Sequence, residues 1–173
     1  WVLKAHPTKA SGTSGRKVRT DRGNCSDHFA VVFQYPEGVN VSFSGVQFGD
    51  AWSDVCERFF GSKGVSESHY TGGVRIHGAE AWDAEKDPAY QPPPGQPAAP
   101  FNALKDADAE KEKAFIASIV SGKYHSEAAA GAESALTAIL GRTAAYTGQE
   151  VTWDDMLRSD QAYDAGIDLN KLA

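Results

Sequence analysis

The sequence predicts an α+β fold, in which an open, largely antiparallel β-sheet of about six strands packs on C-terminal helices. Three observations support this prediction. Alternating apolar runs dominate residues 27–78, proline crowds residues 83–100, and apolar residues recur at helical spacing only after residue 105. We expect residues 1–173 to form a single domain, because a chain of this length can bury one core of its own.

The first strands are expected in the N-terminal third. A short strand and a polar turn fit residues 2–11, and the charged run Arg16–Thr20 resembles an edge strand, where charges prevent unwanted pairing. Apolar residues alternate along His28–Tyr35 and again along 39–45, and Pro36-Glu37-Gly38 forms the turn between them. Small polar residues occupy one side of 39–45, which predicts a sheet with one face on the core and one face open.

A second hairpin is predicted next. The runs Asp54–Phe60 and Val65–Tyr70 flank the tight turn Gly61-Ser62-Lys63-Gly64, and Val74–Gly78 follows as a further strand. Strands that arrive in order along the chain favour a meander. Residues 83–100 are rich in proline, which excludes a regular helix or a central strand, so we predict a surface loop there.

Three helices are predicted in the C-terminal part. The first covers residues 105–121, and the second begins with Ser126 as its N-cap and ends at Gly148. Thr152 and Asp155 have the spacing of a capping box and predict a short third helix. The order, strands first and helices after, is typical of α+β proteins.

The composition argues against nucleic acid and membranes as partners. The chain has 17 Lys and Arg against 23 Asp and Glu, which gives a net charge of −6, and no basic stripe stands out. No run of about 18 apolar residues is present that could span a bilayer. Cys25 and Cys56 have no metal-binding spacing, so we expect free thiols and leave a disulfide open.

The N-terminus predicts a piece of a longer protein. The chain begins at Trp1, and its only methionine is Met156, so either processing or a start partway through a protein is expected. No charged segment followed by a hydrophobic stretch marks a signal peptide. We expect a cytoplasmic location and leave open an export signal upstream of Trp1.

The familiar catalytic motifs are absent from the sequence. Neither glycine-rich phosphate loop occurs, and no G-x-S-x-G or H-E-x-x-H is present. The five histidines are spread singly, so we expect no metal site. Polar side chains along the strands are the candidates for substrate binding, although a solvated or ion-paired surface is the simpler alternative for each. These candidates are Arg16, His28, Gln47, Arg75 and His77.

Among these candidates, His28 carries one additional signal. It follows Asp27 at the start of a predicted strand, and a neighbouring carboxylate can fix the tautomer of an imidazole. A hydrolase that uses this pair is the weakest of our hypotheses, because no convincing nucleophile accompanies it.

Three stretches of the sequence resemble the C-terminal domain of the Gfo/Idh/MocA oxidoreductase family. They are residues 24–33 (NCSDHFAVVF) with the following YPEGV at 35–39, residues 56–65 (CERFFGSKGV) and residues 132–157 (AESALTAILGRTAAYTGQEVTWDDML). The resemblance implies a two-domain enzyme in which a Rossmann domain binds NAD or NADP. An open-faced C-terminal sheet would supply the substrate pocket and the subunit interface, and hydride transfer would act on a sugar or polyol.

The chain lacks the motifs with which this family binds its cofactor and carries out catalysis. The glycine-rich cofactor fingerprint and the catalytic lysine of a Glu-Lys-Pro segment are absent, and the family's catalytic pair would lie upstream of Trp1. The resemblance therefore assigns no catalytic or cofactor-binding residue to this chain. NAD or NADP is implied only for a full-length parent.

The main hypothesis is a partial-length NAD(P)-dependent oxidoreductase. This chain would be its substrate-binding domain, inactive alone and joined to further copies through the sheet face. The alternative is a free-standing module that dimerises through the sheet, or binds a ligand, without catalysis.

Overall fold

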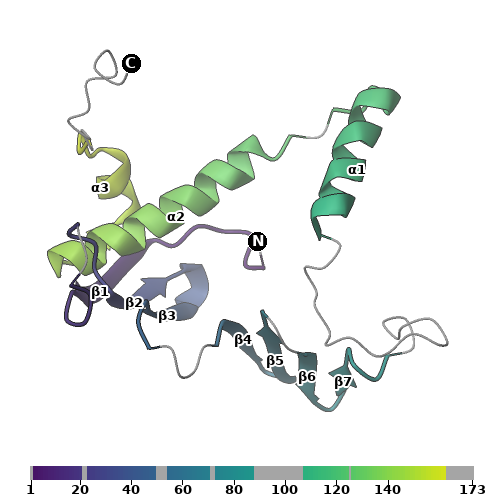
Figure 1. The fold of residues 1–173 in the computed structure, drawn as a ribbon, viewed down its shortest axis with the longest axis horizontal. Helices are drawn as coiled ribbons and strands as arrows, with labels where there is room; N and C mark the ends of the chain where they lie inside the picture. Colours follow the sequence, from purple (N-terminus) through teal and green to yellow (C-terminus); the bar gives the residue numbers. More distant parts are fainter. Residues whose placement is uncertain are drawn as a thin grey trace. The chain divides into compact units, whose positions relative to one another are not determined.

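The protein is described by a computed structural model that covers residues 2–20, 23–49, 54–70, 73–87, 107–124 and 126–162. These residues form eight strands and three α-helices with only antiparallel pairing, which confirms the predicted α+β class (Figure 1). The strands divide into two four-stranded sheets, β3-β2-β1-β8 and β4-β5-β6-β7. Each sheet belongs to its own compact unit, the first formed by Trp1–Phe48 with Ser126–Ala173 and the second by Gly49–His125.

The first sheet is a meander with one added strand. β1 (Lys9–Gly15), β2 (His28–Gln34) and β3 (Asn40–Val46) pair in sequence, and β8 (Val151–Thr152) joins the other edge of β1. A short 3₁₀ turn, Pro36–Gly38, connects β2 to β3. The strands that alternation predicted over residues 28–35 and 39–45 are therefore confirmed, whereas β1 begins later than residues 2–11 suggested.

The predicted edge strand Arg16–Thr20 is wrong. The structure has bends and irregular backbone there, because three successive N–H groups are donated to one carboxylate instead of a neighbouring strand. Lys17, Val18 and Arg19 each bond Oδ2 of Asp27, at 2.9, 2.8 and 2.9 Å. A backbone that surrounds a carboxylate in this way cannot also form a sheet ladder.

One face of the first sheet is covered by α2 (Ala128–Thr147), which packs on β1 and β2. The helix is rich in alanine, so its backbone can approach the sheet closely. Gly148 ends it with a φ of +66°, and its N–H bonds the Ala144 carbonyl, as predicted. The core lies at this contact and consists of Ala10, Val31, Leu140, Ala144, Ala145, Trp153 and Met156.

The short α3 (Trp153–Leu157) completes the first unit. Thr152 is its N-cap and accepts a hydrogen bond from the Asp155 N–H at 3.1 Å, which confirms the predicted cap. The His6 ring stacks on Trp153 with centroids 4.2 Å apart, and its Nδ1 lies 3.0 Å from Glu133 Oε1. These contacts hold the segment before β1 against α2 and α3.

The second sheet is a pure meander. β4 (Cys56–Gly61) and β5 (Gly64–His69) form the predicted hairpin, followed by β6 (Val74–Gly78) and β7 (Trp82–Asp83). The helix α1 (Ala107–Ser121) ends at Gly122, which has a φ of +66°. The predicted loop at 83–100 lies outside the described residues from residue 88 onward. None of the described helices is long and apolar enough to cross a membrane.

The contact between α2 and β2 predicts opposite effects for two glycines of one helix. A Cβ at Gly141 would overlap the Phe33 ring, whereas a Cβ at Gly131 would meet nothing within 4 Å. Gly141→Ala should destabilise the chain by about 1–2 kcal/mol through overpacking, and Gly131→Ala should stabilise it by up to about 1 kcal/mol through helix propensity. Urea denaturation measures the free energy of unfolding of both variants. A Gly141→Ala variant more stable than wild type would contradict the close contact between Gly141 and Phe33.

Candidate functional site

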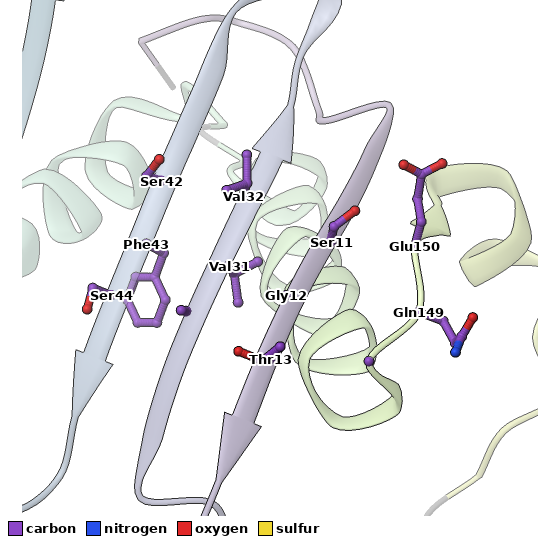
Figure 2. A pocket seen from close by; sticks show the side chains of 12 residues that line it. Ser11, Gly12, Thr13, Val31, Val32, Ser42, Phe43, Ser44, Gln149 and Glu150 are labelled. Carbon is purple, nitrogen blue, oxygen red and sulfur yellow. The ribbon is translucent and has the colours of Figure 1, made fainter.

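The face of the first sheet opposite α2 carries small and polar side chains. By register, two rows of cross-strand neighbours lie there, Ser11–Val32–Ser42 and Thr13–Ala30–Ser44. They line a shallow depression of about 640 Å³, shown in Figure 2. Val32 is 42% exposed, so within the described residues of this unit no helix covers this face. The short side chains leave room above the strands for a flat or hydroxylated ligand.

Three of the predicted candidates meet at one end of this sheet. Gly15, His28 and Val46 form the last row of the ladder. The row continues one residue further, because the Asp27 N–H bonds the Gly15 carbonyl and the Gln47 N–H bonds the Asp27 carbonyl, both at 2.8 Å. Arg16, which follows Gly15, therefore lies at the same end as His28 and Gln47.

Asp27 is the fully buried polar residue of this end. Burial alone would raise its pKa, but hydrogen bonds donated by the backbone of Arg19, Val18 and Lys17 and by the His28 ring outweigh it. Together they hold the pKa of Asp27 well below its usual range. The carboxylate is therefore ionised at neutral pH and fully paired.

His28 is held by this carboxylate and remains accessible. Its Nδ1 lies 2.8 Å from Asp27 Oδ1, so Nδ1–H donates and Nε2 of the neutral ring is an acceptor. The ring lies over Gly15, where a Cβ would come within 2.7 Å of Cε1. The side chain is 40% exposed, and no described residue bonds Nε2. An oriented imidazole of this kind can accept a hydroxyl proton.

The side chains of Arg16 and Gln47 have different surroundings at this end of the sheet. The Arg16 guanidinium donates to the Cys25 carbonyl at 3.1 Å, so it helps to shape the loop around Asp27. Gln47 is exposed, with its backbone fixed by Asp27. The structure thus gives Arg16 a structural contact and leaves the Gln47 side chain on the surface.

Arg75 and His77 lie on β6 in the second unit, apart from this ladder. Arg75 forms ion pairs with Glu85 at 3.0 Å and Asp83 at 3.4 Å, and the hydrogen bond with Glu85, followed by the charge of Asp83, raises its pKa. His77 is exposed. The described structure does not join these two residues to His28.

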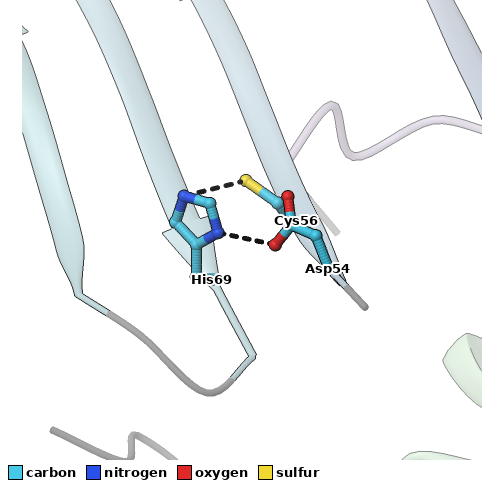
Figure 3. A group of neighbouring side chains, drawn as sticks. All are labelled: Asp54, Cys56 and His69. Carbon is cyan, nitrogen blue, oxygen red and sulfur yellow. Dashed lines mark hydrogen bonds and ion pairs between the residues drawn. The ribbon is translucent and has the colours of Figure 1, made fainter. Parts of the chain in front are cut away.

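A second cluster, which the sequence analysis missed, lies on the β4–β5 hairpin. Asp54, Cys56 and His69 each offer a ligand atom, and these atoms lie within 4.8 Å of one another (Figure 3). A two-residue turn at Ser62-Lys63 makes Cys56 and His69 cross-strand partners. That turn was predicted, so pairing residues symmetrically about it would have found Cys56 opposite His69, with Asp54 two residues before.

Charges are balanced within this cluster. Glu67 Oε1 lies 2.6 Å from Nε2 of His69, and Asp54 Oδ1 lies 2.8 Å from Nδ1. Hydrogen bonds with Glu67 and then Asp54 raise the pKa of His69, and bonds from Arg58 and His69 lower the pKa of Glu67 to about 2. Burial raises the pKa of the Cys56 thiol. Without a bound cation, the ring is an imidazolium between two carboxylates.

Comparisons with known proteins show a fold that this chain shares with a solved structure. No family model matches the sequence, and no curated protein matches it. Among solved structures, the chain is similar to a "putative oxidoreductase" from Thermotoga maritima, with a TM-score of 0.57 and 16% identity. The match covers 88% of this chain and 42% of that chain, so this chain spans less than half of that protein. At this identity the likeness shows a shared fold.

The burial of Asp27 predicts a pH-dependent stability. Its pKa is lower in the folded chain than in the unfolded chain, where it is about 3.9. The ionised carboxylate therefore stabilises the fold above that pH, and this contribution is lost as the pH falls below it. At pH 7, Asp27→Asn should lower the melting temperature by about 5–10 °C, and the difference from wild type should narrow towards pH 3.

The matched control is Asp160→Asn, since Asp160 is exposed beyond α3. This variant should melt within about 1 °C of wild type at both pH values. Thermal unfolding, monitored by circular dichroism, gives the melting temperatures of the wild type and of the two variants. A melting temperature for Asp27→Asn equal to that of wild type at pH 7 would show that the carboxylate does not hold this loop.

Proposed function

We propose that the chain is the substrate-binding and subunit-interface domain of an NAD(P)-dependent oxidoreductase of the Gfo/Idh/MocA type, which acts on a sugar or polyol. The observation that carries the proposal is the similarity of 88% of the chain to part of a protein described as a "putative oxidoreductase". The quoted stretches at 24–39, 56–65 and 132–157 support the same family. A likeness that covers 42% of that protein agrees with a role as one domain of a larger enzyme.

The open face of the first sheet supports a hydroxylated substrate. Polyols need several hydrogen-bond donors and acceptors above an unobstructed surface. The depression is lined by the hydroxyl-bearing residues Ser11, Thr13, Ser42 and Ser44. His28 adds an oriented acceptor, Nε2, at the end of this face. In this proposal His28 accepts a hydrogen bond from a substrate hydroxyl and fixes its orientation.

The nicotinamide cofactor would supply the hydride chemistry, and another part of the enzyme would hold it. This chain has no glycine-rich dinucleotide fingerprint, so we assign none of its residues to the cofactor. Its own contribution is to bind and orient the substrate, and it should be inactive alone.

The first test is hydride transfer by the longer polypeptide that the proposal requires. With NAD⁺ or NADP⁺ and a panel of sugars and polyols, reduced nicotinamide should form, which is measured by its absorbance at about 340 nm. His28→Asn keeps a donor for Asp27 and removes Nε2. It should raise KM about tenfold and change kcat much less, because it removes one substrate hydrogen bond.

Two controls make this test specific. Gln34→Ala changes the opposite end of β2 on the same face and should leave KM within about twofold. The 173-residue chain alone should show no turnover. Binding of a polyol without hydride transfer by the longer polypeptide would support the free-standing binding module instead. An unchanged KM in His28→Asn would remove His28 from the site.

We also propose that copies of the chain associate through the part of the open face around the exposed Val32, two rows from His28, which leaves the His28 end of the face uncovered for the substrate. Val32→Lys should convert a dimer into monomers, since a buried lysine without a partner is costly. Val41→Lys is the control, because Val41 lies opposite Phe33 on the other face of the sheet. Sedimentation measures the oligomeric state of the wild type, Val32→Lys and Val41→Lys. A monomeric wild-type chain would refute this interface.

A further inference from the structure

We propose that Asp54, Cys56 and His69 form a Zn²⁺ site on the β4–β5 hairpin of the second unit. The inference is separate from the proposed oxidoreductase function, because it rests only on contacts within this hairpin. Figure 3 shows the thiol of Cys56 and the carboxylate of Asp54 directed towards the two nitrogens of the His69 ring.

The donor set suits zinc. A thiolate, an imidazole nitrogen and a carboxylate oxygen are the three ligand types that Zn²⁺ takes in proteins, whereas Ca²⁺ and Mg²⁺ prefer oxygen alone. Three protein ligands leave a fourth tetrahedral position for water or a further carboxylate. The ligand atoms lie within 4.8 Å of one another, and the edges of a tetrahedral zinc shell measure about 3.3–3.6 Å. Zinc binding therefore requires these separations to change by at most about 1.5 Å, and the 2.8 Å between Asp54 Oδ1 and Nδ1 must open slightly.

The backbone allows this adjustment of the side chains without disturbing the sheet. Cys56 and His69 are directly paired across the hairpin, so the ladder holds their Cα positions. The sulfur now lies 3.7 Å from Nε2 of His69, so the Cys56 side chain must turn towards Nδ1 to reach the ion. Asp54 lies two residues before β4, and its Oδ1 is already 2.8 Å from Nδ1, so its side chain needs the smaller adjustment.

A neighbouring carboxylate already orients the ring. Glu67 Oε1 contacts Nε2 at 2.6 Å, and Arg58 Nε donates to Glu67 Oε2 at 2.7 Å. Metal-bound histidines commonly donate their second N–H to a carboxylate in this way. In the bound form, Nδ1 faces the ion beside Asp54, and Nε2–H keeps its bond to Glu67. Binding releases the Nδ1 proton of His69 and the thiol proton of Cys56 to solvent.

Cobalt(II) tests the site, because it occupies zinc sites and reports its ligands by colour. Titration of the reduced 173-residue chain with Co²⁺ should give saturable one-to-one binding. The spectrum should combine a thiolate-to-cobalt charge-transfer band with the intense visible bands of tetrahedral Co²⁺. Equimolar Zn²⁺ should bleach both, because zinc binds more tightly than cobalt to a site of this kind.

Two pairs of variants locate the ligands. Cys56→Ser should abolish the charge-transfer band, whereas Cys25→Ser, which removes the only other thiol, should retain it. His69→Asn should weaken Co²⁺ binding at least about tenfold, whereas His77→Asn on β6 should leave it unchanged. Circular dichroism checks that each variant folds, and Asp54→Asn offers a near-isosteric third variant, which should also weaken binding at least about tenfold.

Either of two results would overturn the proposal. The first is the absence of saturable one-to-one binding by the wild-type chain. The second is cobalt binding that survives in Cys56→Ser and His69→Asn with an unchanged spectrum. In both cases the cluster would be an ion-pair network that closes the hairpin and holds no metal.

Discussion

The first unit depends on one buried charge. The Asp27 carboxylate accepts three backbone hydrogen bonds from the loop after β1 and one from the His28 ring. Its own backbone extends the ladder by bonding Gly15 and Gln47. One residue therefore ends β1, aligns β2 with β3 and orients the imidazole. A buried carboxylate persists only when it is paired this completely, because an unpaired one would be protonated or expelled.

Much of the fold follows from local patterns in the sequence. Alternation located β2 and β3, Gly148 marked the end of α2, and Thr152 marked the start of α3. The run after Gly15 was predicted wrongly as an edge strand, because its charged residues fit that pattern. The sequence alone did not reveal that its N–H groups bond a carboxylate eight to ten residues further along. Whether backbone N–H groups bond a neighbouring strand or a side-chain carboxylate depends on tertiary contacts, which a local pattern does not report.

The sites were predictable to different degrees. The Asp27–His28 pair was visible as neighbours, but the position of Gly15 beneath the ring depends on the register between strands. Arg75 was a reasonable candidate by type, yet two carboxylates occupy its guanidinium. The division of the strands between two units was also not evident from alternation, which reports the faces of a strand and not its neighbours.

The central claim is that the open face beside His28 binds a hydroxylated substrate. The most direct measurement is a crystal structure of the longer polypeptide with nicotinamide cofactor and a bound polyol. We expect a substrate hydroxyl within hydrogen-bonding distance of His28 Nε2, with the Nδ1–Asp27 bond intact. A polyol bound away from this face, with His28 covered by another part of the protein, would contradict it.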